Sequence, residues 1–221
     1  MLKASIFDFD GVIINSESIH HQTEQEIFRT HGIELTREDY MEFAGVSELD
    51  TYELIRQKYQ VDFDTQMILK EKIRLFMKKI DVYDQIPQPP GILKFIDNLY
   101  SNRVLLSIAT SGTRDIAYHV LKKMELLEKF NFMLCGDNIS ISKPSPEIFQ
   151  KSLETSQVSA NETIVIEDSA NGVEAAKKAG IKVVAYKNPD SGNQELKKAD
   201  LIIDDFKQVN YSILSEILLQ K

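Results

Sequence analysis

The sequence predicts an α/β fold, in which a parallel sheet alternates with helices and a helical module is inserted after the first strand. Short β-rich runs recur between helical patterns along most of the chain. The stretch from Asn15 to about Asp84 is different, because it holds amphipathic helical patterns and no convincing strand. A proline cluster at Ile86–Gly91 closes that stretch, as expected of a stiff connector. Together these observations indicate βαβ units interrupted by one helical insertion.

The β-rich runs give the expected order of the sheet-forming segments. Helices separate most of them after the first; one begins near Asn171, carries Val173, Ala176 and Ala179 on one side, and ends at Gly180. Strands joined by helices in this way form parallel sheets. The runs expected as strands are Ala4–Phe9, Val104–Ala109, Phe132–Cys135, Thr163–Ile166, Lys182–Tyr186 and Leu201–Ile203.

The inserted stretch shows apolar residues at helical spacing. We therefore expect an α/β core formed by residues 1–14 and 85–221, and a helical domain formed by residues 15–84. The apolar positions that indicate its helices are Ile19, Ile27, Phe28, Met67, Ile68, Ile73 and Phe76.

Composition limits the partners and the compartment. The 221 residues carry a formal net charge of −8, which argues against nucleic acid or an anionic membrane as the main partner but allows a small anionic substrate. No apolar run approaches the ~20 residues that span a bilayer. Cys135 is the only cysteine, so no internal disulfide can form, and its apolar surroundings favour a buried thiol. With no secretory signal visible, we expect a cytoplasmic protein and, by default, a monomer.

Four polar segments lie at, or just beyond, the C-terminal ends of predicted strands, where ligands bind in open α/β sheets. Phosphoryl transfer through a carboxylate needs a nucleophilic carboxylate, a second one that moves protons, oxygen ligands for Mg²⁺, and cationic and amide groups for the phosphoryl oxygens. Each segment alone has an ordinary explanation as a loop or a helix start, and their combination carries the inference. The segments are Asp8/Asp10, Thr110-Ser111-Gly112-Thr113, Lys143-Pro144 and Glu167-Asp168.

The motifs at these four segments give the chain a resemblance that covers nearly its whole length. The chain resembles the haloacid dehalogenase-like superfamily, in the branch with a helical cap between the first two motifs, and is most similar to the β-phosphoglucomutase and sugar-phosphatase group. This resemblance implies a Rossmann-like core with an inserted α-helical cap. The motifs are Asp8-Phe9-Asp10-Gly11-Val12, Ser142-Lys143-Pro144-Ser145-Pro146-Glu147-Ile148-Phe149 and Glu167-Asp168-Ser169-Ala170-Asn171-Gly172.

The resemblance also implies roles for the polar residues. Asp8 would be the nucleophile that becomes an aspartyl-phosphate, and Asp10 the general acid and base for the leaving oxygen and the water. Thr110, with the amides of Ser111 and Gly112, would hold the phosphoryl group, and Lys143 would bridge that group to Asp8.

The implied metal is Mg²⁺, which suits an all-oxygen ligand set. Asp8, the main-chain carbonyl of Asp10, and Asp168 would bind it, and Glu167 would support or join that site. An ordinary Asp titrates near ~3.9, so Asp10 can act as an acid near neutrality only if its protonated form is stabilised by roughly 4 kcal/mol. We therefore expect the Asp10 side chain to face the phosphate and to lie away from the metal.

The cap segment offers candidates for substrate recognition. Ser16 and His20, expected one turn apart on the first cap helix and facing the presumed cleft, would bond a sugar hydroxyl or reach Asp10; the alternative is a capping serine and a partly exposed histidine. The segment Gly45-Val46-Ser47 resembles the substrate loop of β-phosphoglucomutases. Those mutases follow this serine with an arginine that grips a second phosphate, whereas this chain has Glu48.

The favoured interpretation is a Mg²⁺-dependent phosphatase of a small phosphorylated metabolite, of the sugar-phosphate type. A β-phosphoglucomutase is the second interpretation, and Glu48 counts against it. A haloacid dehalogenase would need neither the metal set nor Asp10. A non-catalytic ligand-binding protein on the same fold would be expected to lack the nucleophile or part of the metal set, and every core position is filled here.

Overall fold

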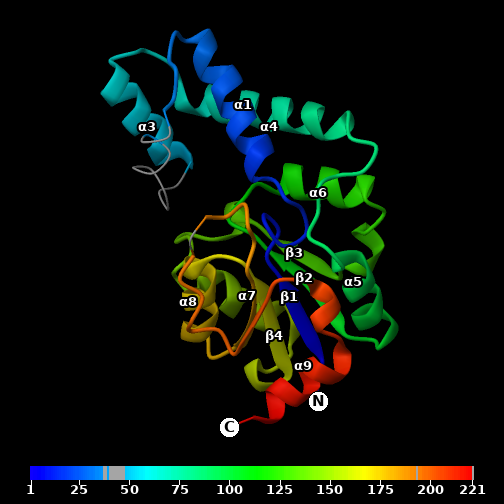
Figure 1. Cartoon of the computed structure of the whole chain (residues 1–221). Helices are drawn as coiled ribbons and strands as arrows, with labels where there is room; N and C mark the ends of the chain where they lie inside the picture. The colour runs from blue at the N-terminus through cyan, green and yellow to red at the C-terminus, as the bar shows by residue number, and fades with distance from the viewer. Residues whose placement is uncertain (37–38, 40–47, 193, 221) are drawn as a thin grey trace. The chain divides into compact units, whose positions relative to one another are not determined.

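The computed structural model describes residues 1–36, 39, 48–192 and 194–220. It divides into two compact units, one formed by Met1–Glu17 with Ile86–Lys221 and the other by Ser18–Gln85. Figure 1 labels most of the helices and strands of the two units.

The first unit is built on a parallel sheet. Among the described residues, six strands pair in the order β3-β2-β1-β4-β5-β6, and every pair is parallel. The Rossmann-like α/β class expected from the sequence is therefore confirmed. The strands are β1 (Ala4–Phe7), β2 (Leu105–Ala109), β3 (Phe132–Leu134), β4 (Thr163–Glu167), β5 (Lys182–Tyr186) and β6 (Leu201–Ile203).

Two strands match their predicted bounds, and the other four differ by one or two residues at one end. The largest difference is at β1, which ends at Phe7 and not at Phe9 as predicted. The chain turns at once after the strand, because the amide of Ile13 donates to the Phe9 carbonyl at 2.8 Å and the amide of Gly11 donates to the Ile14 carbonyl at 2.7 Å. Gly11 has a φ of +80°, a conformation that residues with a Cβ rarely adopt.

The strand order creates a switch point between β1 and β4. From β1 the chain builds outward through β2 and β3 on one side, then returns to build β4, β5 and β6 on the other. In open α/β sheets, ligands bind at the carboxyl ends of the strands beside such a switch point. Phe7 is in register with both Ile108 of β2 and Ile166 of β4, so the residues after these three strands emerge at nearly the same level.

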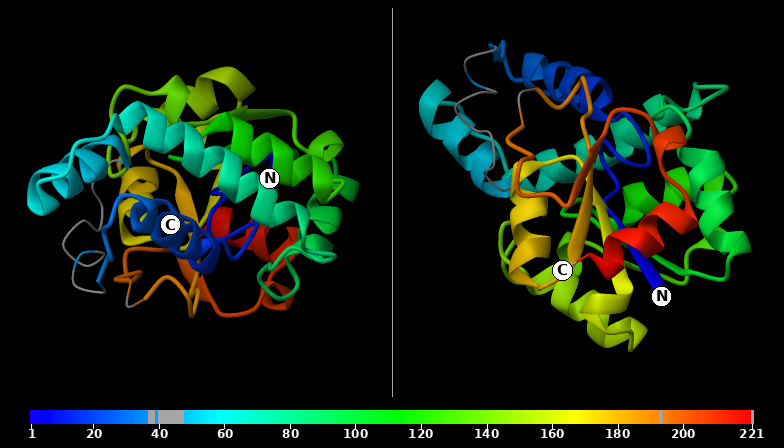
Figure 2. Two further views of the ribbon diagram at one scale, coloured as in Figure 1. Left: turned by 90° about the horizontal axis from the view of Figure 1, so that it is seen from above. Right: turned by 60° about the horizontal axis from the view of Figure 1, so that its bottom comes forward.

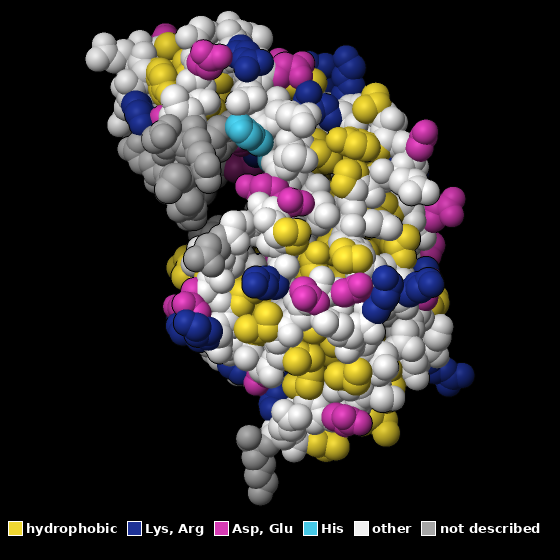
Figure 3. All heavy atoms as spheres, in the orientation of Figure 1, with side chains coloured by type: hydrophobic (Ala, Val, Ile, Leu, Met, Phe, Trp, Pro, Cys, Tyr) yellow, Lys and Arg dark blue, Asp and Glu magenta, His cyan; other side chains and the backbone are white. Residues whose placement is uncertain are grey.

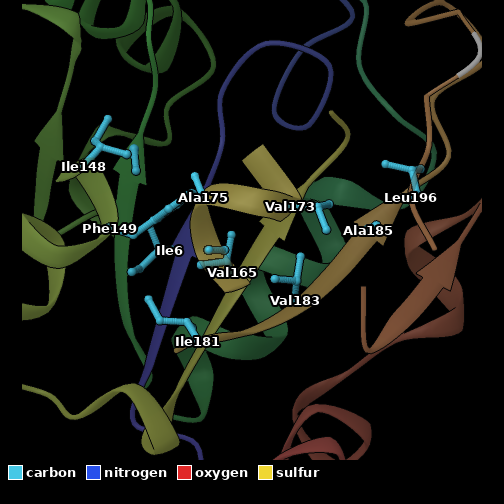
Figure 4. Packing of buried hydrophobic residues seen from close by; sticks show 12 residues of the cluster. Ile6, Ile148, Phe149, Val165, Val173, Ala175, Ile181, Val183, Ala185 and Leu196 are labelled. Atoms are coloured by element: carbon cyan, nitrogen blue, oxygen red, sulfur yellow. The ribbon is translucent and has the colours of Figure 1, made fainter. Parts of the chain in front are cut away.

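Helices cover both faces of the sheet, as the right panel of Figure 2 shows. On one face, α7 (Glu147–Ser156) and α8 (Ala170–Lys178) pack against side chains that alternate along the central strands. Figure 4 shows this core from close by. Its labelled residues are Ile6, Ile148, Phe149, Val165, Val173, Ala175, Ile181, Val183, Ala185 and Leu196.

Aromatic side chains dominate the opposite face. Phe7 of β1 contacts Phe95 at a ring separation of 5.9 Å, and Phe95 stacks on Phe206 at 5.4 Å. Phe95 lies on a helix with a strongly apolar face, so the helix buries that face against the sheet. The remaining elements of this unit are α5 (Ile92–Ser101), α6 (Arg114–Lys123), α9 (Tyr211–Leu219) and the short 3₁₀ helices η1 (Leu127–Lys129), η2 (Gly136–Asn138), η3 (Ala160–Glu162) and η4 (Phe206–Gln208).

The regular elements in the described part of the second unit are all helices. It holds α3 (Glu48–Tyr59) and α4 (Thr65–Asp81), and most of α1 (Glu17–Thr30). Asp64 caps α4 by accepting hydrogen bonds from the amides of Gln66 and Met67. A separate apolar core formed by all three helices, centred on Phe28 and Tyr52, holds this unit together.

The surface carries mixed charges. On the face drawn in Figure 3, Lys and Arg side chains lie beside Asp and Glu side chains. No helix in the described part of the chain is long and apolar enough to span a membrane. Cys135 is buried, as expected, and burial raises the pKa of its thiol to about 11.

Candidate active site

Asp8 lies at the switch point of the sheet. It is the first residue after β1, and its amide donates to the Ile166 carbonyl of β4 at 2.9 Å. This bond continues the strand pairing by one residue and fixes the backbone from which the side chain projects. The side chain is buried, and burial raises the pKa of Asp8 well above its ordinary value, although Lys143 opposes that shift.

Lys143 binds Asp8 directly. Its Nζ donates to Asp8 Oδ1 at 2.6 Å, to Glu167 Oε1 at 2.7 Å and to the Ala109 carbonyl at 3.0 Å, so all three ammonium protons have acceptors. Burial alone would lower the pKa of Lys143, but the two carboxylates outweigh burial and raise it. The lysine is therefore held charged and in one orientation between the ends of β1, β2 and β4.

The loop before α7 carries Lys143, and Glu147 anchors that loop. The two carboxylate oxygens of Glu147 accept hydrogen bonds from the amides of Ser140 and Ile141, each at 2.9 Å. Lys151, one turn further along α7, also donates to Glu147, at 2.8 Å. These bonds lower the pKa of Glu147 to about 2, with the Lys151 contact contributing most.

Glu167 is the last residue of β4 and is fully buried. One of its oxygens accepts from Lys143, while the other accepts from the amides of Asp168 and Ser169, both at 2.9 Å. A Cβ on Gly172 would lie 1.7 Å from the Glu167 carboxylate, so only glycine fits at that point of α8. Both Glu167 oxygens are thus already hydrogen-bonded within the protein.

Asp168 follows immediately and points toward the loop after β1. A Cβ on Gly11 would lie 2.0 Å from Asp168 Oδ2, which explains the glycine in the first motif. Asp168 Oδ2 accepts hydrogen bonds from Ser191 and Asn188. Burial is the main reason why the pKa of Asp168 rises to about 7, and the neighbouring Glu167 raises it further.

The charges of this cluster do not balance within the protein. Carboxylate oxygens of Asp8, Glu167 and Asp168 lie within 4.8 Å of one another, and all three residues are buried. Among the described residues that contact them, Lys143 supplies a single positive charge. When all three carboxylates are ionised beside one lysine, two negative charges are left, and a divalent cation with oxygen ligands would balance them. The residues present therefore fit the expected metal.

Thr110 follows β2 and is buried. Its amide donates to the Leu134 carbonyl at 3.1 Å, and its Oγ1 accepts from the amide of Gly112 at 2.9 Å. We expected the Gly112 amide to face a phosphoryl group. In this structure it donates its hydrogen bond to the Thr110 hydroxyl. Because Thr110 Oγ1 already accepts one bond, its hydroxyl proton is available to donate to another acceptor. The helix that follows, α6, begins after Thr113 without a side-chain cap.

Asp10 is partly exposed and is held by Ser16. The Ser16 hydroxyl donates to Asp10 Oδ1 at 2.6 Å. Of the two partners considered for Ser16, a sugar hydroxyl or Asp10, the structure shows Asp10. Ser16 was expected on the first cap helix, but it lies one residue before α1 and belongs to the same compact unit as Asp10.

The other candidates belong to the helical segment, residues 15–84. His20 is on α1, where its ring stacks on Phe76 of α4 at 4.4 Å within the second unit. Gly45, Val46 and Ser47 lie outside the described residues.

Glu48 begins α3 and has a partner that the sequence did not indicate. It forms an ion pair with Lys72 of α4, which also pairs with Glu24 of α1 at 2.9 Å. Lys72 is buried, and its pKa is raised by the two carboxylates against the opposing effect of burial. The resembling mutases have an arginine at this position. Here the position carries Glu48, and its carboxylate is paired with Lys72 of the same unit.

Sequence reasoning missed Asn188 and Ser191, which bind Asp168. Both lie in the loop after β5, as isolated polar residues in a stretch with no motif. Only the placement of β5 beside β4 brings this loop to the site.

A buried aspartate bound by a lysine, beside further acids at the switch point of a parallel sheet, lies where α/β proteins bind their ligands. The family model of the haloacid dehalogenase-like hydrolases matches residues 5–186. The chain belongs to this family, as its motifs led us to expect.

Relatives of known name agree with this class. The chain is 29% identical over 181 residues to a phosphorylated carbohydrates phosphatase of Thermotoga maritima, covering 82% of this chain and 83% of that protein. It is 26% identical over 217 residues to a validoxylamine A 7'-phosphate phosphatase of Streptomyces hygroscopicus subsp. limoneus, covering 96% and 97%.

Solved structures agree as well. CbbY from Rhodobacter sphaeroides in complex with phosphate superposes with a TM-score of 0.86 at 25% identity, covering 93% of this chain and 95% of that one. A β-phosphoglucomutase from Clostridium difficile superposes with a TM-score of 0.83 at 25% identity, covering 99% and 98%.

Proposed function

We propose that this protein is a Mg²⁺-dependent phosphatase that hydrolyses a small phosphorylated metabolite, of the sugar-phosphate type, through an aspartyl-phosphate on Asp8. The observation that carries the proposal is the contact of Asp8 with Lys143 beside Asp168 and Glu167. The names of the two related phosphatases support a phosphorylated carbohydrate or a similar polyol as substrate.

In the first step, a carboxylate oxygen of Asp8 attacks the phosphorus, and the bond from phosphorus to the ester oxygen breaks. Asp10 gives its proton to the leaving oxygen, so the product leaves as a neutral alcohol. Lys143 and the Thr110 hydroxyl stabilise the charge that develops on the phosphoryl oxygens.

In the second step, water attacks the same phosphorus and the bond to Asp8 breaks. Asp10, now ionised, takes the proton from the water and so returns to its starting state. The hydrogen bond from Ser16 holds the Asp10 carboxyl in place, which suits a group that must serve both steps. The products are inorganic phosphate and the free alcohol.

Asp8, Asp168 and the main-chain carbonyl of Asp10 would hold Mg²⁺, with Glu167 supporting the site through Lys143 and the backbone. When bound, the cation supplies charge neutralisation that lets the Asp8 carboxylate and the phosphoryl group approach each other. The imbalance of two negative charges among the buried side chains supports this assignment.

We further propose that residues 15–84 form the cap domain and that the protein works as a cytoplasmic monomer. The substrate residues proposed in the cap are His20 and the loop Gly45-Val46-Ser47. A reducing compartment is consistent with the buried, unpaired thiol of Cys135.

A β-phosphoglucomutase is the second candidate, because one such enzyme has a similar structure. A mutase must hold a bisphosphate, and the acid at Glu48 would repel a second phosphate where the resembling mutases have an arginine. The pairing of Glu48 with Lys72 also engages the buried lysine of this unit. We therefore rank the phosphatase first.

The test is phosphate release from a panel of phosphorylated sugars, polyols, nucleotides and glycolate, with Mg²⁺ and with a chelator. Asp8→Asn is the matched blank, because it keeps the shape of the side chain and removes the nucleophilic charge. Turnover that requires Mg²⁺ and is lost in Asp8→Asn would support the phosphatase, and the best substrate would define what the cap recognises.

No release across the panel would count against a phosphatase. β-Glucose 1-phosphate with a bisphosphate primer would then test the mutase by formation of glucose 6-phosphate. Failure of both assays in a folded protein would favour a non-catalytic binding protein.

A further inference from the structure

Asn188 connects two segments of the proposed metal site. Its side-chain Nδ2 donates to the Gly11 carbonyl at 3.2 Å and to Asp168 Oδ2 at 3.3 Å. Gly11 follows Asp10 in the loop after β1, whereas Asp168 follows β4. Asn188 is 4% exposed, so both contacts are shielded from water.

The orientation of the Asn188 amide group follows from a third hydrogen bond. Its Oδ1 accepts from the amide of Asp190 at 2.9 Å. An amide has one acceptor end and one donor end, so this bond directs the NH₂ group toward Gly11 and Asp168. The reversed orientation would set an oxygen against a carbonyl and a carboxylate.

Ser191 binds the same carboxylate oxygen as Asn188. The Ser191 hydroxyl donates to Asp168 Oδ2 at 2.5 Å. Its carbonyl accepts from Gln194 Nε2 at 2.9 Å, and Gln194 Oε1 accepts from the amide of Ala170 at 3.0 Å. Ala170 is the first residue of α8, so the loop after β5 is tied to the helix that follows Asp168.

We propose that Asn188 and Ser191 are positioning residues that hold Asp168 in the orientation that binds the divalent cation. Both donate to Oδ2, and no described residue donates a hydrogen bond to Oδ1. Two donors on one oxygen fix the plane of the carboxylate and leave the other oxygen for a ligand. The inference rests on the proposed function, because it assumes that Asp168 is a metal ligand.

The bond from Asn188 to Gly11 has its own consequence. Asp168 approaches so close to Gly11 that a Cβ there would meet Oδ2 at 2.0 Å and the Asn188 amide at 2.9 Å. Asn188 thus fixes the spacing between the loop after β1 and the end of β4. Since the neighbouring Asp10 carbonyl and Asp168 are both proposed metal ligands, their separation depends on this side chain.

The test is a titration of the full chain with Mn²⁺, in which the electron paramagnetic resonance signal of the free ion measures binding. Mg²⁺ is then added as a competitor. In Asn188→Ala and in Ser191→Ala we expect the dissociation constant for Mn²⁺ to rise about 10- to 100-fold, the usual effect of removing a residue that orients a metal ligand. At saturating metal, KM for the best substrate of the panel should stay unchanged. Ser191→Thr keeps the hydroxyl and should bind Mn²⁺ close to the wild-type affinity.

Matched controls separate positioning from a general loss of structure. Asn210→Ala removes an asparagine whose side chain accepts from the Ile213 amide at the start of α9, and Ser159→Ala removes a serine bonded to Glu162. Both should leave Mn²⁺ affinity unchanged even if the melting temperature falls. If the controls weaken Mn²⁺ binding as much as the test variants do, the positioning role is wrong.

The remaining outcomes distinguish this inference from the proposed function. If Asn188→Ala and Ser191→Ala bind Mn²⁺ as tightly as the wild type does, the positioning inference is overturned and the proposed function is not. Absence of Mn²⁺ and Mg²⁺ binding in the folded wild type would overturn the metal assignment, and the inference with it. If Asn188→Ala does not fold, Ser191→Ala and Ser191→Thr decide.

Discussion

Each unit of the molecule holds a buried lysine between two carboxylates, yet the two clusters differ in kind. In the α/β unit, Lys143 binds Asp8 and Glu167, whose side chains are 11% and 0% exposed. In the helical unit, Lys72 binds Glu24 and Glu48, whose side chains are 18% and 41% exposed. A buried lysine with two acidic partners is therefore not by itself a sign of catalysis.

The difference lies in what surrounds each ion pair. The partners of Lys72 reach solvent, so water can screen the remaining negative charge. The partners of Lys143 are buried with a further acid, Asp168, and they follow or end the two parallel strands, β1 and β4, between which the order of the strands reverses. Excess buried negative charge at a switch point fits a bound divalent cation, whereas the ion pairs of Lys72 join three helices.

The largest expected effect is on activity in Asp8→Asn. Removing the nucleophile should lower phosphate release by about 10⁵-fold or more, as replacing a covalent nucleophile does in other enzymes. The melting temperature of the metal-free protein should not fall, because the variant removes one of the crowded buried charges. Substantial residual turnover that a chelator abolishes would show that another residue attacks phosphorus.

The next largest effect is a difference in stability between variants of the two buried lysines. Lys143→Met should cost about 3–5 kcal/mol of unfolding free energy, because it leaves Asp8 and Glu167 buried without a counter-charge. Lys72→Met should cost about 1–3 kcal/mol, because Glu24 and Glu48 can turn to water. Urea unfolding of both metal-free variants measures the difference, and equal losses would contradict the contrast between the clusters.

The loop that carries Lys143 should respond to acid through Glu147. The pKa of Glu147 is lowered to about 2 by its bonds to Lys151 and the loop amides, so its contribution to stability is complete above the ordinary carboxyl pKa. That contribution is lost as pH falls from about 4.5 toward 2. Glu147→Gln should therefore show a shallower loss of stability across this range; Glu71→Gln on α4 is the matched control. Parallel curves for wild type and Glu147→Gln would contradict the anchoring role.

The smallest expected effect is in Glu48→Gln. Lys72 keeps Glu24 as a partner, and the Glu48 side chain is 41% exposed, so the cost should be about 1 kcal/mol or less. Thermal unfolding at low and high salt measures it. A loss as large as that of Lys143→Met would mean that Lys72 and its two acids are as tightly coupled as Lys143 and its two acids.

Much of the α/β unit could be predicted from the sequence. Buried parallel strands are largely apolar, so their centres were recognisable, and the acids stand at or directly after the strand ends. The bounds of β1 were less predictable, because Phe9 is apolar and buried but belongs to the turn that Gly11 makes. Periodicity does not distinguish an apolar turn from the last residues of a strand.

The supporting residues could not be predicted in the same way. Asn188 and Ser191 reach Asp168 only because β5 lies beside β4, and no local pattern records that contact. The pairing of Glu48 with Lys72 joins two helices across 24 positions and was equally invisible. Motifs locate groups that touch the substrate, whereas the residues that orient those groups depend on tertiary packing.

The most direct test of the account is whether Asp8 carries the phosphoryl group during turnover. The protein would be mixed with Mg²⁺ and acetyl phosphate, a small phosphoryl donor, quenched in acid, and digested for mass spectrometry. We expect one added phosphoryl group on the peptide that contains Asp8, absent with a chelator and absent in Asp8→Asn. Phosphate release by the wild type with a phosphoryl group trapped on a different peptide would contradict it.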